Sequence, residues 1–321
     1  MMESRGTQVY NVSQLCSTFG HTRQAFYKPR VSLAFQNEVR IKLVEKIFEC
    51  RKVRPTAGCR YIYDELPEDW PWGRDKTEQA LLEMGFRVRY PTNTVKTTKP
   101  GSTVFSNLIL GYKIKSINKV WQADLTYFFT QDGNTCYLIL ITDVYSQLIV
   151  GCGAYVSYPA SVVLEVLQRA IKKRGGANLK GLIHHSDRGS QYGSELYQRE
   201  LQRYEIIPSM CKYSWENPFA EKTNDLIKNG YLVAWAPKDI KELRKLLNRA
   251  VNNHNRRQRK QKLGNLSPMQ FESELLKNSG TNAYELCLKP TEQWDYILAK
   301  KDKIAYPQKQ KVMSLPQTPS F

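Results

Sequence analysis

The sequence predicts an α/β fold with a mixed sheet covered by helices, a helical module before it and a basic helix after it. Three observations predict this organisation. The first 90 residues show helical periodicity that Pro55 and Gly58 interrupt. From Val120 the apolar residues recur with the two-residue period of strands. Beyond residue 156, helical and strand patterns alternate as far as about residue 235.

Residues 1–90 are predicted to form a helix-turn-helix-like DNA-binding module. Ser13 is expected to cap a first helix, Gly20 to turn the chain, and residues 22–27 to form a second short helix. A helical hairpin without DNA contact is the alternative. An amphipathic helix around residues 39–47 and a helical pair at 61–66 and 76–84 are expected to follow. Residues 91–119, rich in Thr, Ser, Pro, Gly and Lys, are interpreted as a linker.

Residues 120–236 are predicted to contain the sheet. Strands at 120–129, 135–143 and 147–156 form a meander, with Asp132, Gly133 and Asn134 at its first turn. A helix at 161–174, a strand at 181–186, a helix at 194–204, a strand at 206–210 and a helix at about 220–235 are expected next. This order is that of the ribonuclease H-like fold.

The predicted closing segment, residues 237–276, is helical and strongly basic. Its helix at 239–255 leads into a basic run that starts with Arg256 and Arg257 and ends at Lys262. Contact with DNA phosphates is the functional interpretation, and a solvated helix face is the alternative. The weakly patterned tail, residues 277–321, receives no role.

Charge and composition point to a polyanionic partner. The 48 Lys and Arg residues exceed the 30 Asp and Glu residues and give a net charge of +18. Nucleic acid is the first candidate and an anionic membrane surface the second, although no apolar run is long enough to span a bilayer. The seven cysteines form no CxxC pair, and the four histidines lack zinc-finger spacing. We therefore expect reduced thiols, a cytoplasmic location and no structural zinc.

Three carboxylates are candidate metal ligands for phosphodiester chemistry. Asp124 lies within a predicted strand and points away from its more apolar face. Asp187 follows another strand, and Glu221 begins a helix. Hard divalent ions such as Mg²⁺ bind carboxylate oxygens, and a pair of such ions assists cleavage of a phosphodiester. Because acidic residues are common, this spacing by itself supports the set only weakly.

Several other polar residues are weighed against plainer interpretations. Asp143 is either a rival ligand or a turn residue bonded near Ser146, and Glu216 is a rival to Glu221. His185 is expected either to contact phosphate or to be structural, and Asn217 to bond DNA or the loop backbone. The remaining candidates for DNA contact are Lys228, about two helical turns beyond Glu221, and Arg188, at a turn that could cradle an anion.

Four segments carry a more specific resemblance. They read VWQADLTYF, YLILITDVYSQLIVG, LIHHSDRGSQYGSELY and SMCKYSWENPFAEKTNDLIK. They resemble the catalytic core of OrfB-type insertion-sequence transposases, in the retroviral-integrase superfamily, and the similarity extends over roughly residues 10–276. The family's catalytic triad falls on Asp124, Asp187 and Glu221. The family commonly has Asp-Asn-Ala where this sequence has Glu216, Asn217 and Pro218, and a Tyr where it has His254.

The resemblance implies a Mg²⁺-dependent (or Mn²⁺-dependent) transposase that cleaves DNA and joins the freed 3′-hydroxyl to a second site. It also implies a homo-oligomer on paired terminal repeats and an upstream OrfA-type partner. A nuclease that cuts without joining and an inactive repeat-binding protein remain as alternatives. An RNA-binding module is weakened by the lack of an RNP-like aromatic strand motif.

Overall fold

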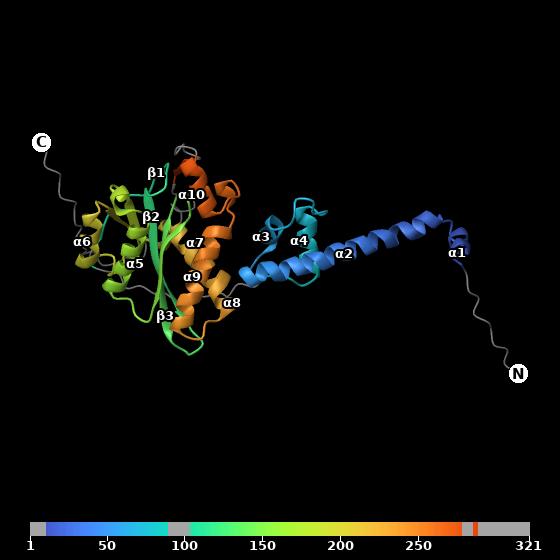
Figure 1. Cartoon of the computed structure of the whole chain (residues 1–321), viewed down its shortest axis with the longest axis horizontal. Coiled ribbons are helices and arrows are strands. Elements are labelled where there is room, and N and C mark those ends of the chain that lie inside the picture. The colour runs from blue at the N-terminus through green and yellow to red at the C-terminus, as the bar shows by residue number, and fades with distance from the viewer. Residues whose placement is uncertain (1–10, 89–101, 103, 278–284, 288–321) are drawn as a thin grey trace, which may run out of the picture. The chain divides into compact units, whose positions relative to one another are not determined.

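The computed structural model describes residues 11–88, 102, 104–277 and 285–287 (Figure 1). The chain divides into two compact units. The first comprises residues 1–53 and 57–88, and the second comprises residues 54–56 and 89–321. Each unit has a hydrophobic core of its own. Residues 1–10 of the predicted DNA-binding module, much of the predicted linker and most of the tail lie outside the described residues.

The described part of the first unit contains four helices: α1 (Val12–Thr18), α2 (Arg23–Val53), α3 (Cys59–Asp64) and α4 (Arg74–Glu83). One face of α2, with Val39, Leu43 and Ile47, packs in the same buried cluster as Ile62 and Trp72. The predicted helices around residues 39–47, 61–66 and 76–84 are thereby confirmed, with small shifts of their ends.

Two details of the helix-turn-helix prediction were wrong. Asn11, and not Ser13, caps α1, because its side chain accepts a hydrogen bond from the backbone of Gln14 and Gln14 reciprocates. Residues 22–27 form no separate short helix, since α2 runs for 31 residues. Pro29 lies within α2, and residues 30–53 contain no glycine or proline, so nothing beyond Pro29 stops the helix before Pro55.

The second unit is built on a five-stranded sheet in the order β4-β3-β2-β5-β6. Its strands are β2 (Val120–Phe129), β3 (Thr135–Asp143), β4 (Ile149–Tyr155), β5 (Ile183–Ser186) and β6 (Ile207–Met210). The first three are antiparallel neighbours, whereas β5 is parallel to β2 and β6 is parallel to β5. This topology is that of the ribonuclease H-like fold, as the sequence predicted.

Helices cover both faces of the sheet (Figure 1). Helices α5 (Ala160–Lys173) and α6 (Glu195–Arg203) contribute to the core cluster that contains Trp121, Ala123 and Leu125 of β2. The opposite face, with Leu138 and Leu140 of β3, is buried with residues of α7 (Pro218–Ile227), η3 (Lys228–Leu232) and α9 (Ile240–Arg257). Alternate residues of β2 therefore serve two different layers.

The helix predicted at about 220–235 is divided into three parts. Helix α7 ends at Ile227, a π-helical turn η3 follows, and α8 (Val233–Trp235) completes it. The closing segment contains α9, capped by Asp239, and a further helix α10 (Pro268–Lys277). No helix among the described residues is both long and apolar enough to cross a bilayer.

Part of the predicted linker belongs to the second unit. Ile109 and Ile114 are buried in a cluster with Val120, and β1 (Lys113–Ile114) pairs antiparallel with β7 (Leu286–Cys287). The polar composition of residues 91–119 concealed these two apolar anchors. The described part of the linker is thus a docked segment, and residues 285–287 of the tail return to the same place.

Candidate active site

Asp124 lies in the middle of β2, and its side chain leaves the sheet on the face covered by α7. Its neighbours Ala123 and Leu125 are buried in the core on the opposite face. The Nδ2 atom of Asn224 in α7 donates a hydrogen bond of 2.7 Å to Asp124 Oδ2. The strand phase predicted from the sequence is therefore confirmed, and Asp124 is held from across the layer by an amide.

Asp187 follows the last residue of β5, next to β2 in the sheet. In this parallel ladder Gln122 pairs with His185, so continuing the register by two residues places Asp187 level with Asp124. Neighbouring strands are about 4.8 Å apart. The backbone N–H of Gly189 donates a 3.0 Å hydrogen bond to Asp187 Oδ1 and orients that carboxylate. The register of the two strands and the electrostatic interaction between the two aspartates place these side chains close to each other.

Glu221 lies in the first turn of α7, and β2 fixes the position of that turn. The buried side chain of Gln122 accepts hydrogen bonds from the backbone N–H groups of Phe219 (2.9 Å) and Ala220 (3.3 Å). The Glu221 backbone N–H bonds to the carbonyl of Asn217 at 3.1 Å. Gln122 and Asp124 are two residues apart and point to the same face of β2. The face that carries Asp124 therefore also anchors the helix that carries Glu221.

The electrostatics of Asp124 connect the three carboxylates. Burial, the negative charge of Asp187 and, more weakly, that of Glu221 together raise the pKa of Asp124 to about 7. The hydrogen bond from Asn224 acts in the opposite direction. Asp124 keeps some exposed surface, so the group can still meet a ligand from solvent. The three acidic side chains interact across one small region.

The donor chemistry of this region fits a hard divalent cation, because carboxylate oxygens are the ligands that Mg²⁺ prefers. A cation there would offset the repulsion that raises the pKa of Asp124. Among the described residues, however, no group of three or more His, Cys, Asp or Glu side chains is arranged as a ready metal site. The structure shows the carboxylates as electrostatic neighbours and not as a closed ligand shell.

The chain is similar to known proteins over most of its length. A family model described as the integrase core domain matches residues 115–214, which include Asp124 and Asp187. A protein of insertion element IS600 from Shigella sonnei, described as an uncharacterised 31 kDa protein, is 30% identical over 267 residues. That match covers 80% of this chain and 97% of the Shigella protein. The chain belongs to the insertion-sequence transposases with an integrase-type core.

The chain matches other relatives over shorter lengths. The putative transposase of IS986/IS6110 from Mycobacterium tuberculosis is 33% identical over 162 residues, covering 49% of this chain and 58% of that protein, less than two thirds of its length. The transposase InsF of IS3A from Escherichia coli K12 is 27% identical over 235 residues, which cover 68% of this chain and 77% of InsF.

Among solved structures, the chain resembles the magnesium complex of the HTLV-2 integrase catalytic core domain. The identity is 19%, the TM-score is 0.38, and the match covers 51% of this chain and 98% of that one. The catalytic core domain of BIV integrase is 17% identical with a TM-score of 0.40, and that match covers 50% of this chain and 99% of the BIV chain. The assignment to the ribonuclease H-like fold depends on the strand order of the sheet itself.

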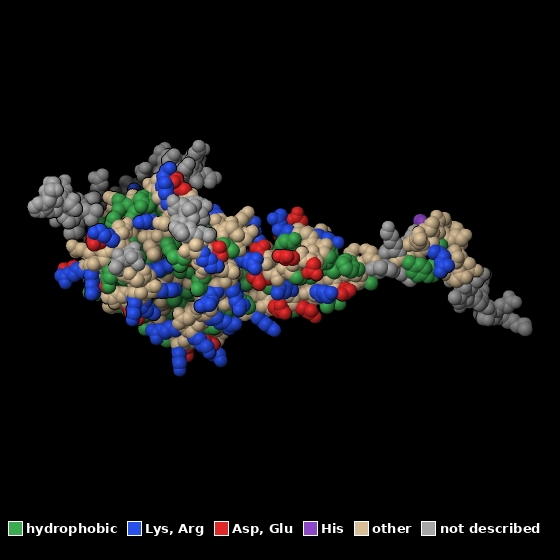
Figure 2. Space-filling model, turned by 45° about the horizontal axis from the view of Figure 1, so that its top comes forward, with side chains coloured by type: hydrophobic (Ala, Val, Ile, Leu, Met, Phe, Trp, Pro, Cys, Tyr) green, Lys and Arg blue, Asp and Glu red, His purple; other side chains and the backbone are tan. Residues whose placement is uncertain are grey.

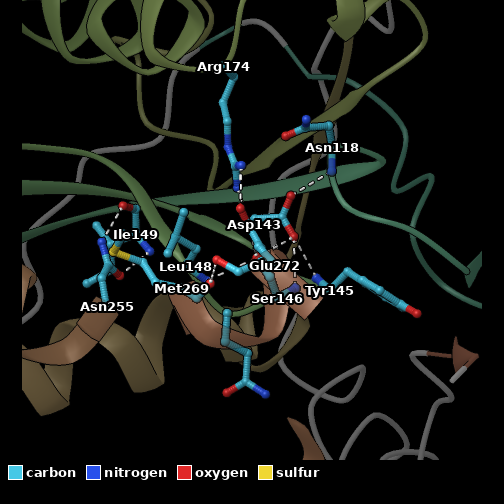
Figure 3. Close-up of polar contacts among 12 residues, drawn as sticks. Asn118, Asp143, Tyr145, Ser146, Leu148, Ile149, Arg174, Asn255, Met269 and Glu272 are labelled. Carbon is cyan, nitrogen blue, oxygen red and sulfur yellow. Dashed lines mark hydrogen bonds and ion pairs between the residues drawn. The ribbon is translucent and has the colours of Figure 1, made fainter. Parts of the chain in front are cut away.

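The two rival carboxylates, Asp143 and Glu216, have structural roles. Asp143 is completely buried and accepts hydrogen bonds from the backbone N–H groups of Asn118, Tyr145 and Ser146, at 2.7, 3.0 and 3.0 Å (Figure 3). It therefore closes its own turn, as the alternative interpretation held. Glu216 accepts hydrogen bonds from the backbone N–H groups that precede it in its loop. Both carboxylates have backbone N–H donors as partners.

The two candidate residues with buried side chains also have structural partners. His185 is fully buried, its Nδ1 atom lies 2.9 Å from Ser209 Oγ, and burial lowers its pKa to about 4. Asn217 is 2% exposed, and its Nδ2 atom donates a 2.9 Å hydrogen bond to the carbonyl of Ala123. These positions favour the structural alternatives over direct contact with DNA.

The four basic candidates occupy different positions. The ammonium of Lys228 lies 4.0 Å from the centre of the Tyr127 ring, and partial burial lowers its pKa. Arg188 is half-buried next to Asp187, although the Gly189 amide of its predicted anion-cradling turn is bonded to Asp187. Arg256 and Arg257 are exposed at the end of α9. Contact of these residues with DNA stays a prediction.

Two residues that position the site were missed from the sequence. Gln122 and Asn224 are buried polar residues that reach across from β2 to α7. A signal was present in each case. Gln122 shares the strand face of Asp124 two residues earlier, and Asn224 lies three residues after Glu221 on the same helix face.

Proposed function

We propose that this transposase catalyses metal-dependent cleavage and joining of DNA, and that Asp124, Asp187 and Glu221 are its catalytic, metal-binding carboxylates. The observation that supports the proposal is that Asp187, directly after β5, interacts with Asp124 on the adjacent parallel strand β2, with Glu221 on the helix that β2 anchors. Three acidic side chains from separate elements are what two-ion phosphodiester chemistry requires.

In the proposed reaction, a water oxygen attacks a phosphodiester at the element's end and frees a 3′-hydroxyl. That hydroxyl then attacks a second phosphodiester and displaces one of its strands. Divalent ions, when bound, lower the pKa of the attacking oxygen and neutralise charge on the phosphate. Asp124 and Asp187 would be shared between the ions, and Glu221 would hold the second. Mg²⁺ is the expected ion, with Mn²⁺ as a substitute.

The remaining residues and partners of the reaction complete the proposal. We assign phosphate contacts to Lys228, Arg188, Arg256 and Arg257. On the face of the second unit drawn in Figure 2, Lys and Arg side chains outnumber Asp and Glu side chains. The helical first unit would recognise terminal repeats. A homo-oligomer on paired DNA ends and an OrfA-type partner are inferred from the family resemblance, and a cytoplasmic location is inferred from the cysteine pattern.

A strand-transfer assay with a pre-cut, labelled DNA end tests the proposal. The variants Asp124→Asn, Asp187→Asn and Glu221→Gln should each lower joining by roughly a thousandfold, since each removes several kcal/mol of charge stabilisation. The matched control is Glu216→Gln, five residues before Glu221, which should retain joining because Gln keeps an oxygen acceptor for the loop. Cleavage without joining would establish a nuclease, and equal activity of wild type and Asp124→Asn would remove the triad.

A further inference from the structure

The loop between β6 and α7, residues 211–217, is tied to both aspartate-bearing strands. At its start, the backbone N–H of Cys211 donates a 2.9 Å hydrogen bond to the carbonyl of Ser186, the residue before Asp187. At its end, Asn217 Nδ2 bonds to the carbonyl of Ala123, the residue before Asp124. The loop is therefore fixed directly beside the two carboxylates.

A carboxylate holds the loop in shape from within. Glu216 Oε2 accepts hydrogen bonds from the backbone N–H groups of Lys212 (2.6 Å) and Tyr213 (3.0 Å). The Glu216 backbone N–H bonds in turn to the Tyr213 carbonyl at 3.0 Å. This reciprocal bonding fixes the backbone from which the aromatic side chains of the loop project.

The side chains of Tyr213 and Trp215 form a stacked pair. Their ring centres are 4.3 Å apart and their planes differ by 11°. The ammonium of Lys212 lies 5.0 Å from the centre of the Tyr213 ring. Both rings are partly exposed. A cation next to parallel, accessible aromatic rings is the combination with which proteins bind unpaired nucleobases.

We propose that the Tyr213–Trp215 pair is a stacking site for an unpaired nucleobase of the DNA strand being processed. The inference rests on the proposed function, because the site matters for the reaction only if the neighbouring carboxylates act on DNA. A base stacked on this pair would leave the duplex next to Asp124 and Asp187, and Lys212 would meet the adjoining phosphate. Stacking tolerates all four bases, so the site would recognise an unpaired end and not a sequence.

The test uses the full-length protein in EDTA and two DNA probes, a blunt duplex and the same duplex with a short single-stranded overhang. Trp215→Ala and Tyr213→Ala should weaken binding of the overhang probe roughly 5- to 150-fold, the range for loss of one stacked base. Binding of the blunt duplex should stay nearly unchanged. Trp215→Phe keeps a stacking ring and should rescue most of the affinity. The control is Phe129→Ala, which removes an aromatic side chain at the end of β2, outside the loop. Phe129 is 57% exposed.

A second measurement locates the base. 5-Iododeoxyuridine in the overhang, irradiated with near-ultraviolet light, should crosslink to Trp215 or Tyr213, as identified by mass spectrometry. The proposal is overturned if the crosslinks map elsewhere, or if Trp215→Ala binds both probes like wild type or loses both equally. If the wild-type protein joins DNA but Trp215→Ala binds the overhang probe as tightly as wild type, only the proposed stacking site is contradicted. Crosslinking at Trp215 by a protein that never cuts or joins DNA would contradict only the proposed reaction.

Discussion

The negative charge of Asp124 is unfavourably placed. It is surrounded by protein on most sides and faces two like charges, and its ionised form is favoured by hydrogen bonds from the Asn224 amide and, more weakly, from the Leu125 backbone. A residue kept in such a place lowers stability in the free protein, as expected of a functional site. Its consequences at the residue scale can be measured without knowing the DNA sequence.

Asp124→Asn should stabilise the metal-free protein in a pH-dependent way. The pKa of Asp124 is about 7 in the folded state and near 4 in the unfolded chain, so the folded state holds the proton longer. Stability therefore falls as pH rises from about 4 to 7. In EDTA, the variant should melt roughly 5 °C above wild type at about pH 8 and level with it at about pH 4. A pH-independent difference would show that burial of the charge is not the cause.

Asn224→Ala should shift the acidic limb of the activity–pH profile to higher pH. The lost hydrogen bond stabilises the ionised form, so its removal raises the pKa of Asp124 further. Cation binding requires the ionised carboxylate, and the deficit in joining should be larger at about pH 7 than at about pH 9. Asn229→Ala, which removes an exposed amide bonded to Asp225, is the control and should leave the profile in place. A uniform loss at every pH would contradict this role.

At the scale of elements, a buried ion pair fastens α10 to the catalytic sheet (Figure 3). Glu272 of α10 accepts two hydrogen bonds, of 2.5 and 2.6 Å, from the guanidinium of Arg174, which follows α5. The two side chains are only 12% and 11% exposed. Ser146, in the turn that Asp143 closes, also donates to Glu272. The basic closing segment is thereby joined to the end of β3.

Glu272→Ala should cost about 3 kcal/mol of unfolding free energy, because it leaves the Arg174 charge buried without its main partner. The double variant Arg174→Met, Glu272→Leu should recover most of this loss, since apolar residues of similar volume carry no desolvation cost. The control on the same helix is Glu274→Ala, whose ion pair with Lys277 is exposed and worth at most about 0.5 kcal/mol. Urea unfolding of the four proteins provides the comparison. Equal losses for Glu272→Ala and Glu274→Ala would contradict the argument.

At the scale of the whole molecule, the charge of +18 determines how DNA binding responds to salt. Each neutralised phosphate releases counterions, so the logarithm of the affinity falls linearly with the logarithm of salt concentration. The exposed residues at the end of α9 are expected to contribute to that slope without reading bases. This contribution is measured as the salt dependence of the affinity for DNA of unrelated sequence.

Arg256→Gln and Arg257→Gln should each reduce the salt slope by about 1 and weaken binding to all sequences alike. The control is Lys180→Gln, an exposed lysine whose charge already pairs with Glu205. Fluorescence anisotropy at several salt concentrations measures the slopes. If both arginine variants keep the wild-type slope, this end of α9 lies away from the DNA, and the solvated-face alternative holds.

The sequence by itself determined the strand and helix order of the core and the face from which Asp124 leaves its strand. These are local properties, because periods of two and 3.6 residues are visible within one segment. The tertiary structure decided which amides serve the carboxylates. Asn224 meets Asp124 across 100 residues of sequence, and Gln122 reaches Phe219 across 97. It also decided that Ile109 and Ile114 dock a polar segment on the core and that His185 and Asn217 are buried. No local period records such contacts, because burial and hydrogen bonding between distant segments exist only once the layers pack together.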